Sequence, residues 1–184
     1  SGSAYLIYGK TDSVPVELSA IELDANLDGF AIDGLSAGNF TGQSISDAGD
    51  VNGDGYDDII IGSPRAGPND AGSGASYVVY GRPDVGGKKI GTGIDLDAIS
   101  TGTGGFVING VAEGDESGRS VSGAGDVNGD GFADLIVGAL YDDPNGLTSG
   151  ASFVVFGSAV GEAVELTAFE AAVPAVVAAE AAVP

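Results

Sequence analysis

Two nine-residue segments of this chain carry oxygen-bearing side chains at a spacing that suits a metal ion. They are Asp50–Asp58 and Asp126–Asp134, and each places Asp, Asn and Asp at positions one, three and five. A tight loop can direct side chains spaced in this way toward one point, and the glycine at position six permits the sharp turn. The two segments are therefore candidate cation-binding loops.

Calcium fits these donors better than magnesium does. It takes six to eight oxygen ligands at roughly 2.3–2.6 Å, whereas magnesium prefers a smaller octahedral shell with retained water. The carbonyl at position seven adds an oxygen, and the carboxylate at position nine completes the shell. We predict two calcium sites, with ligands Asp50, Asn52, Asp54, Tyr56 (carbonyl) and Asp58 in the first loop, and Asp126, Asn128, Asp130, Phe132 (carbonyl) and Asp134 in the second.

The two copies also indicate which acidic residues are not ligands. Asp57 aligns with Ala133 and Asp47 aligns with Gly123, so both aspartates are predicted to face solvent. The rings at position seven are expected to pack while their carbonyls bind. The alternative is a pair of Asn/Asp/Gly turns without metal, but two copies in register, each followed by Asp and a strand, favour the metal.

The region around the loops is repeated, with Asp126 following Asp50 by 76 residues. The matching pairs are Gly42–Gly55 with Gly118–Gly131, Gly29–Gly34 with Gly105–Gly110, and Ser73–Gly81 with Ser149–Gly157, the last with an earlier copy at Ala4–Gly9. A weaker echo relates Leu18–Ile21, Leu96–Ile99 and Leu166–Phe169. An internal repeat of this length indicates a repeat architecture.

Each full repeat contains four segments rich in β-branched and aromatic residues, separated by Gly, Pro, Asn and Asp. The expected strands are 30–33, 43–48, 58–62 and 77–80 in one repeat, and 106–109, 134–138 and 153–156 with the segment before the second loop in the other. We predict an all-β fold of propeller-like blades, each of four antiparallel strands. About two blades and partial flanking units are expected. A two-layer sandwich is the alternative, but it does not explain the faithful repeat.

Composition excludes several classes of protein. The 184 residues include 27 Asp and Glu against 6 Lys and Arg, for a formal net charge of −21, which argues against a nucleic-acid partner. Without Cys or His, thiol and imidazole catalysis and the usual zinc sites are excluded. No apolar run reaches the ~20 residues that span a bilayer. No disulfide can stabilise the domain, so metal is the natural substitute.

The chain divides into four parts on this basis. Residues 1–28 end a preceding repeat, 29–104 and 105–169 hold one calcium loop each, and 170–184 form a low-complexity tail rich in Ala, Val and Pro. The tail is expected to contact a neighbouring copy. The first residue is Ser rather than Met, so we interpret the chain as processed or as a fragment of a longer one.

The motifs resemble FG-GAP repeats, the blades of the integrin α-subunit β-propeller, and more closely the repeats of large bacterial secreted proteins. The matching motifs are Gly-Phe-x-Ile-Asp/Asn-Gly, Ser-x-Ser-x-Ala-Gly-Asp-Val-Asn-Gly-Asp-Gly, Asp-Ile/Leu-Ile-Ile/Val-Gly and Ser-Gly-Ala-Ser-Tyr/Phe-Val-Val-Tyr/Phe-Gly, across roughly residues 1–169. The name-giving Phe-Gly is loosened to Phe40-Thr41-Gly42 and Glu116-Ser117-Gly118. The resemblance implies a calcium-binding module that is secreted or at the cell surface, with the loop ligands named above.

We therefore expect a non-enzymatic, extracellular structural or adhesion module whose partners are proteins or copies of itself. Strand exchange between copies would build a surface filament. The alternative is an accessory domain that binds a partner or a glycan within a larger secreted protein or enzyme, with sugars stacking on Tyr5, Tyr8, Tyr77, Tyr80 and Tyr141. Arg65 and Arg119 are expected to pair with nearby carboxylates.

Overall fold

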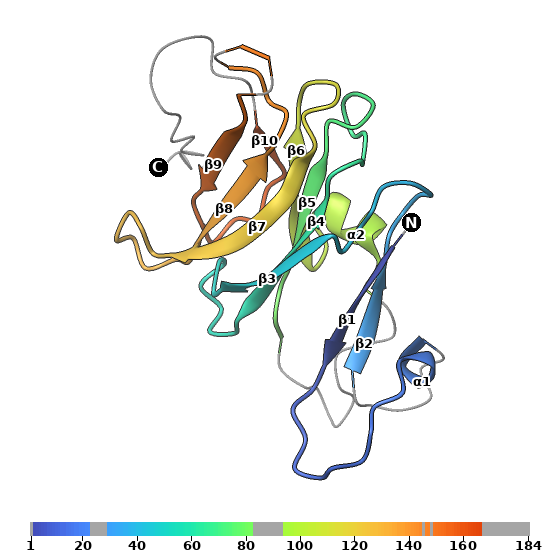
Figure 1. Ribbon diagram of the computed structural model, residues 1–184. Coiled ribbons are helices and arrows are strands. Elements are labelled where there is room, and N and C mark those ends of the chain that lie inside the picture. The colour runs from blue at the N-terminus through green and yellow to red at the C-terminus, as the bar shows by residue number, and fades with distance from the viewer. Residues whose placement is uncertain (1, 23–28, 83–93, 145, 148, 167–184) are drawn as a thin grey trace.

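The part of the chain that the structure describes folds into three β-sheets joined by loops and two short helices (Figure 1). The computed structural model describes residues 2–22, 29–82, 94–144, 146–147 and 149–166. Its strands are β1 (Ser3–Ile7), β2 (Gly29–Asp33), β3 (Ser44–Gly49), β4 (Asp58–Ser63), β5 (Ala75–Val79), β6 (Gly105–Gly110), β7 (Ser117–Gly125), β8 (Asp134–Ala139), β9 (Ala151–Val155) and β10 (Val164–Leu166). The all-β prediction is confirmed.

The central sheet has the strand order β10-β6-β5-β4-β3. Strands β3 to β6 pair antiparallel in sequence, with Ile60 of β4 opposite Val78 of β5. The β-branched runs of β4 and β5 are buried almost throughout, as expected for strands covered on both faces. A register shift between Asp47 and Gly49 bends β3 where the first loop begins.

The second sheet repeats this arrangement with β7-β8-β9, and β1 pairs with β2 in a third. The loops that join β3 to β4 and β7 to β8 lie at the same side of the molecule (Figure 1). These loops are the two candidate metal loops. Repetition in sequence therefore becomes repetition in space.

The strands that pair in one sheet do not all come from the same sequence repeat. Strand β6 opens the second sequence repeat, yet it pairs with β5 of the first, as β2 pairs with β1. Strand β10 adds to β6 in parallel and was not predicted, so the central sheet has a fifth strand beyond the four expected. The weak echoes at Leu18 and Leu96 form single-turn helices, α1 (Leu18–Glu22) and α2 (Leu96–Ser100), which were not assigned either.

The buried core forms two clusters that lie in the seams between sheets. One joins the central sheet to β7–β9 and includes Ile60, Val78, Leu135 and Val137. The other joins the central sheet to β1 and β2 and includes Phe30. Burial of apolar surface at both seams stabilises the stacking of successive units.

Two predictions concern residues outside this description. The low-complexity tail, 170–184, and its contact with a neighbouring copy lie beyond the described residues.

Neither helix in the described part of the chain has the length and hydropathy to cross a bilayer.

Candidate metal centre

Each candidate loop is held between two strands of one sheet. The first loop leaves β3 at Gly49 and enters β4 at Asp58, which is the first residue of that strand. The second leaves β7 at Gly125 and enters β8 at Asp134. Position nine of each loop is therefore anchored to an apolar strand, as predicted.

The side chains at positions one, three and five of the first loop turn inward onto the loop backbone. The amide of Asp54 donates to Oδ1 of Asp50 and to Oδ1 of Asn52, both at 3.0 Å. The amide of Gly55 donates to Oδ2 of Asp50 at 2.9 Å, and that of Tyr56 donates to Oδ1 of Asp54 at 2.9 Å. These bonds collect the oxygens of the three predicted side-chain ligands around one short stretch of backbone.

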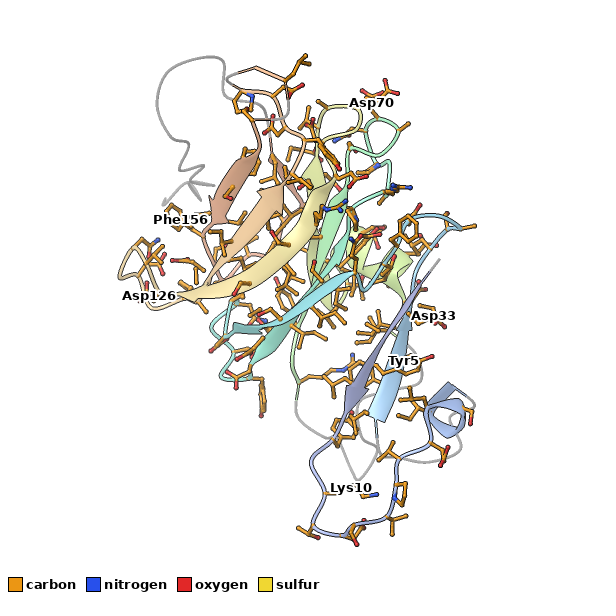
Figure 2. All side chains as sticks on the ribbon, in the orientation of Figure 1. Tyr5, Lys10, Asp33, Asp70, Asp126 and Phe156 are labelled. Carbon is orange, nitrogen blue, oxygen red and sulfur yellow. The ribbon has the colours of Figure 1, made fainter. Side chains whose placement is uncertain are left out.

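The second loop repeats this pattern and adds one bond, from the amide of Gly129 to Oδ1 of Asp126 at 2.7 Å. The amide of Asp130 donates to Oδ1 of Asp126 at 3.1 Å and to Oδ1 of Asn128 at 3.0 Å. The amides of Gly131 and Phe132 donate to Asp126 and Asp130, each at 2.9 Å. Figure 2 shows Asp126 beside the end of β7, away from Asp70 at the other end of the sheets. The shared sequence therefore specifies a shared loop conformation.

Position nine has a second role that sequence reasoning missed. Asp58 is 1% exposed and accepts from the amide of Val51 at 3.0 Å and from the amide of Gly81 at 2.8 Å. Asp134 accepts from Val127 at 2.7 Å and from Gly157 at 2.9 Å in the same way. The carboxylate thus ties the start of the loop to the end of the next strand. The repeated glycine after Tyr80 and Phe156 was the available signal.

The buried carboxylate of Asp58 lies in an unfavourable electrostatic environment. Burial first, and then the charges of Asp54 and Asp50, raise its pKa to about 6. The amides of Gly81 and Val51 only partly oppose this rise. A cation among these groups would favour the ionised form, because opposite charge nearby lowers the pKa of a carboxylate.

The residues present fit calcium in donor type, because each loop offers carboxylate and amide oxygens within one short segment. Among the described residues, no three carboxylates already converge as a ready-made metal centre. Each loop instead offers side-chain oxygens that accept from amides, and a carboxylate keeps further lone pairs for a cation. The amide bonds therefore orient the oxygens without exhausting them.

The structure places the remaining loop residues as follows. Asp47 and Asp57 are exposed, as predicted, and their exclusion from the ligand set stays a prediction. Tyr56 is 42% exposed, whereas the Phe132 ring lies against Gly53 of the first loop. Packing of the position-seven ring is thus found for Phe132, while much of Tyr56 faces solvent.

The end of the sheets opposite the loops carries the two arginines that sequence analysis expected to pair. Nε of Arg65 lies 3.1 Å from Oε1 of Glu116, and Arg119 pairs with the other oxygen of the same carboxylate. Arg65 also lies over the ring of Phe40, 4.9 Å from its centre. Since Phe40 and Glu116 are equivalent repeat positions, the loosened Phe-Gly motif becomes a contact between units.

The five tyrosines suggested as sugar-stacking groups do not gather at one place. Tyr77 is 5% exposed, and Tyr141 lies beside Arg119 at the end opposite the loops. Tyr8 and Tyr80 do line one hollow of about 180 Å³, together with Phe30, Tyr56 and other residues. This hollow is next to the first candidate loop, because Tyr56 and Asp57 line it.

Comparison with known proteins identifies the repeated units. Residues 43–79 and 117–155 match the model of the FG-GAP repeat. Both matches contain one candidate metal loop and the strands on either side of it. The chain is therefore an FG-GAP repeat protein, and this prediction from its motifs is confirmed.

Several relatives are integrin α chains. The chain is 39% identical to integrin alpha pat-2 of Caenorhabditis briggsae over 98 residues (53% of this chain, 7% of the relative) and 34% identical to integrin alpha-PS2 of Drosophila melanogaster over 132 residues (72% and 9%). It is 36% identical to bovine phosphatidylinositol-glycan-specific phospholipase D over 118 residues (61% and 13%). The chain spans roughly a tenth of the length of these relatives, and its units form an integrin-like β-propeller module.

Proposed function

We propose that this chain is an extracellular, calcium-stabilised structural or adhesion module. The observation that supports it most is the repetition of one loop geometry, in which Asp50, Asn52 and Asp54 present oxygens as Asp126, Asn128 and Asp130 do. Calcium would offset the mutual repulsion of these acids and fix each loop to its strand, so binding free energy becomes folding free energy.

Calcium binding is tested by equilibrium dialysis of the metal-free chain. We expect two calcium ions per chain, and little binding of magnesium at equal concentration. A double variant, Asp54→Ala with Asp130→Ala, should bind none at these sites. Retention of two ions by the double variant, or no binding by the unaltered chain, would overturn the proposal.

The proposed module is not catalytic. Its prominent carboxylates are engaged by loop amides or by arginines, as Glu116 is with Arg65 and Arg119. A function in partner binding agrees with the integrin-like units. Location outside the cell or at its surface is part of the same proposal.

We propose further that copies join end to end through strand completion. Among the described strands, β9 ends its sheet, whereas its counterpart β5 pairs with β6. Val127 is 56% exposed, although its equivalent Val51 is 1% exposed in the seam between units. One end of the molecule thus offers surface that the other unit buries.

Sedimentation velocity in calcium tests this assembly. We expect particles larger than one chain, and their loss in Val127→Asp. Val14→Asp provides the control, because Val14 is 64% exposed outside the repeats. Monomers alone at high protein concentration would contradict end-to-end assembly.

A glycan-binding accessory domain is the second candidate. The hollow lined by Tyr8, Tyr56 and Tyr80 is the observation that favours it, because aromatic rings stack on sugars. A glycan array tests it, with Tyr8→Ala as the variant that should lose binding. If Tyr8→Ala bound glycans as well as the unaltered chain does, the hollow would be excluded as the glycan-binding site.

A further inference from the structure

The two metal loops touch one another across the seam between units. The amide of Ala133, at position eight of the second loop, donates to the carbonyl of Asp50, at position one of the first, at 2.9 Å. Ala133 lies between two predicted ligand positions, Phe132 and Asp134. A single hydrogen bond therefore connects the backbones that carry ligands of both sites.

Close packing reinforces this contact. A methyl group placed on Gly49 would lie 2.8 Å from Cβ of Ala133, and one on Gly53 would lie 2.6 Å from Cε1 of Phe132. Real Cβ atoms are rarely this close to a neighbour, so the loops meet with only hydrogen atoms between them. The first loop is thus braced by positions seven and eight of the second.

Within the described part of the chain, no such brace reaches the equivalent positions in the second loop. Gly125 and Gly129 match Gly49 and Gly53 in the repeat, and their φ values of +71° and +79° match +69° and +75°. A methyl group on either would meet nothing within 4 Å. Residue type and φ are therefore closely matched between the two glycine pairs, whereas the contacts around them differ.

We propose that the two loops bind calcium as a coupled pair, with Phe132 and Ala133 acting as positioning residues of the first site. The inference rests on the proposed calcium function and adds that calcium binding at each loop is regulated by calcium at the other. Calcium at the second loop fixes the backbone of Phe132 and Asp134, and hence the donor and the ring that hold Asp50 and Gly53. Calcium at the first loop fixes the same contact from the other side.

Coupling of this kind must be reciprocal. If an ion at one site strengthens binding at the other by some factor, the reverse effect has the same size. The first ion also bears the conformational entropy of ordering the shared backbone, so the second binds at lower cost. Binding isotherms should therefore be cooperative rather than the sum of two independent sites.

The sites can be distinguished because only the first loop contains a tyrosine at position seven. Luminescence of terbium excited through Tyr56 reports the first loop, and calorimetric titration with calcium gives both constants. Phe132→Ala leaves every side-chain ligand and every charge in place. We expect it to weaken the first loop, where it supplies no ligand, by about fivefold or more.

The glycine pair provides a matched control. Gly49→Ala crowds Ala133. We therefore expect it to weaken calcium binding at the second loop by about fivefold or more, as well as calcium binding at the first loop, which contains Gly49. Gly125→Ala has the same backbone strain with open space around it, so it should alter the second loop and leave the first within about twofold. Circular dichroism establishes that each variant is folded, and Phe132→Ala remains the test if Gly49→Ala is not.

The outcomes separate coupling from calcium binding itself. The coupling would be overturned if the two sites bound calcium independently and if neither Phe132→Ala nor Gly49→Ala changed the calcium affinity of the opposite loop. That result would leave the proposed function intact. Absence of calcium binding by the unaltered chain would overturn both. Equal cross-site effects of Gly49→Ala and Gly125→Ala would show that strain, rather than the contact, carries the effect.

Discussion

Individual aspartates in the two loops serve different purposes although they are close in sequence. Asp50 and Asp54 are oriented by amides of their own loop, whereas Asp58 bridges amides of Val51 and Gly81 from two elements. Asp57, between them, is exposed. Asp54 is exposed as well, so the exclusion of Asp57 from the ligand set stays a prediction from the repeat, in which Asp57 aligns with Ala133.

Substitution of Asp54 and Asp57 tests this separation. Asp54→Ala should reduce the calcium stoichiometry from two to one, because it removes the oxygen at position five. Asp57→Ala removes the same charge from the same loop and should keep two ions. Calorimetric titration measures both, and loss of an ion in Asp57→Ala would contradict the assignment.

Asp115 and Asp142 also lie in an unfavourable electrostatic environment, at the end of the sheets opposite the candidate loops. Burial raises the pKa of Asp142, and burial followed by the charge of Asp142 raises that of Asp115, while Asp143 contributes to both. A raised carboxylate pKa means that the folded state binds protons more readily. The free energy of unfolding therefore falls as pH rises from about 3.8 through the folded-state pKa.

Asp142→Asn should remove this cost at neutral pH. We expect a higher melting temperature than that of the unaltered chain at pH 7, and little difference at pH 3, where the carboxyl is already protonated. Thermal denaturation by circular dichroism in chelator measures it. A lower melting temperature at pH 7 would contradict the unfavourable role of this charge.

Equivalent strands in the two units differ in burial. Ile60 of β4 is fully buried in the seam, whereas Ile136, its equivalent in β8, is 37% exposed. Ile60→Ala should lower the free energy of unfolding by about 2–5 kcal/mol, because it leaves a cavity in a packed core. Ile136→Ala should cost about 1 kcal/mol or less. Chemical denaturation compares them, and equal losses would refute this difference in packing.

Most strands could be predicted because their β-branched and aromatic runs lie between glycine-rich turns, as in β4 and β5. Strand β10 could not, because its three residues join β6 in parallel across a long separation. The single-turn helix α2 depends on a local cap, in which Asp95 accepts from the amide of Asp97. Such elements are fixed by tertiary contact or by a single side chain rather than by a periodic pattern.

The same distinction holds at the site. Spacing in the loops predicted the groups that the fold brings together, since positions one, three and five act within one short segment. The bridge from Asp58 to Gly81 could not be predicted, because its partners lie 23 residues apart. Contact between Ala133 and Asp50 depends on how two units stack, which sequence repetition does not specify.

At the scale of the whole molecule, the acidic loops of successive units lie at one side of the stacked sheets (Figure 1). The formal net charge is −21, so repulsion among negative charges opposes folding of the chain without metal. Calcium would neutralise part of this charge where it is most concentrated. The fold should therefore be considerably more stable with calcium than without it.

The melting temperature of the chain in calcium and in chelator tests this account most directly. Two sites at a free calcium concentration of one hundred times Kd would add about 5 kcal/mol to the free energy of unfolding. For a domain of this size, that raises the melting temperature by on the order of 10 °C or more. We expect this rise with calcium and not with magnesium. An identical melting temperature in saturating calcium and in chelator would contradict the account.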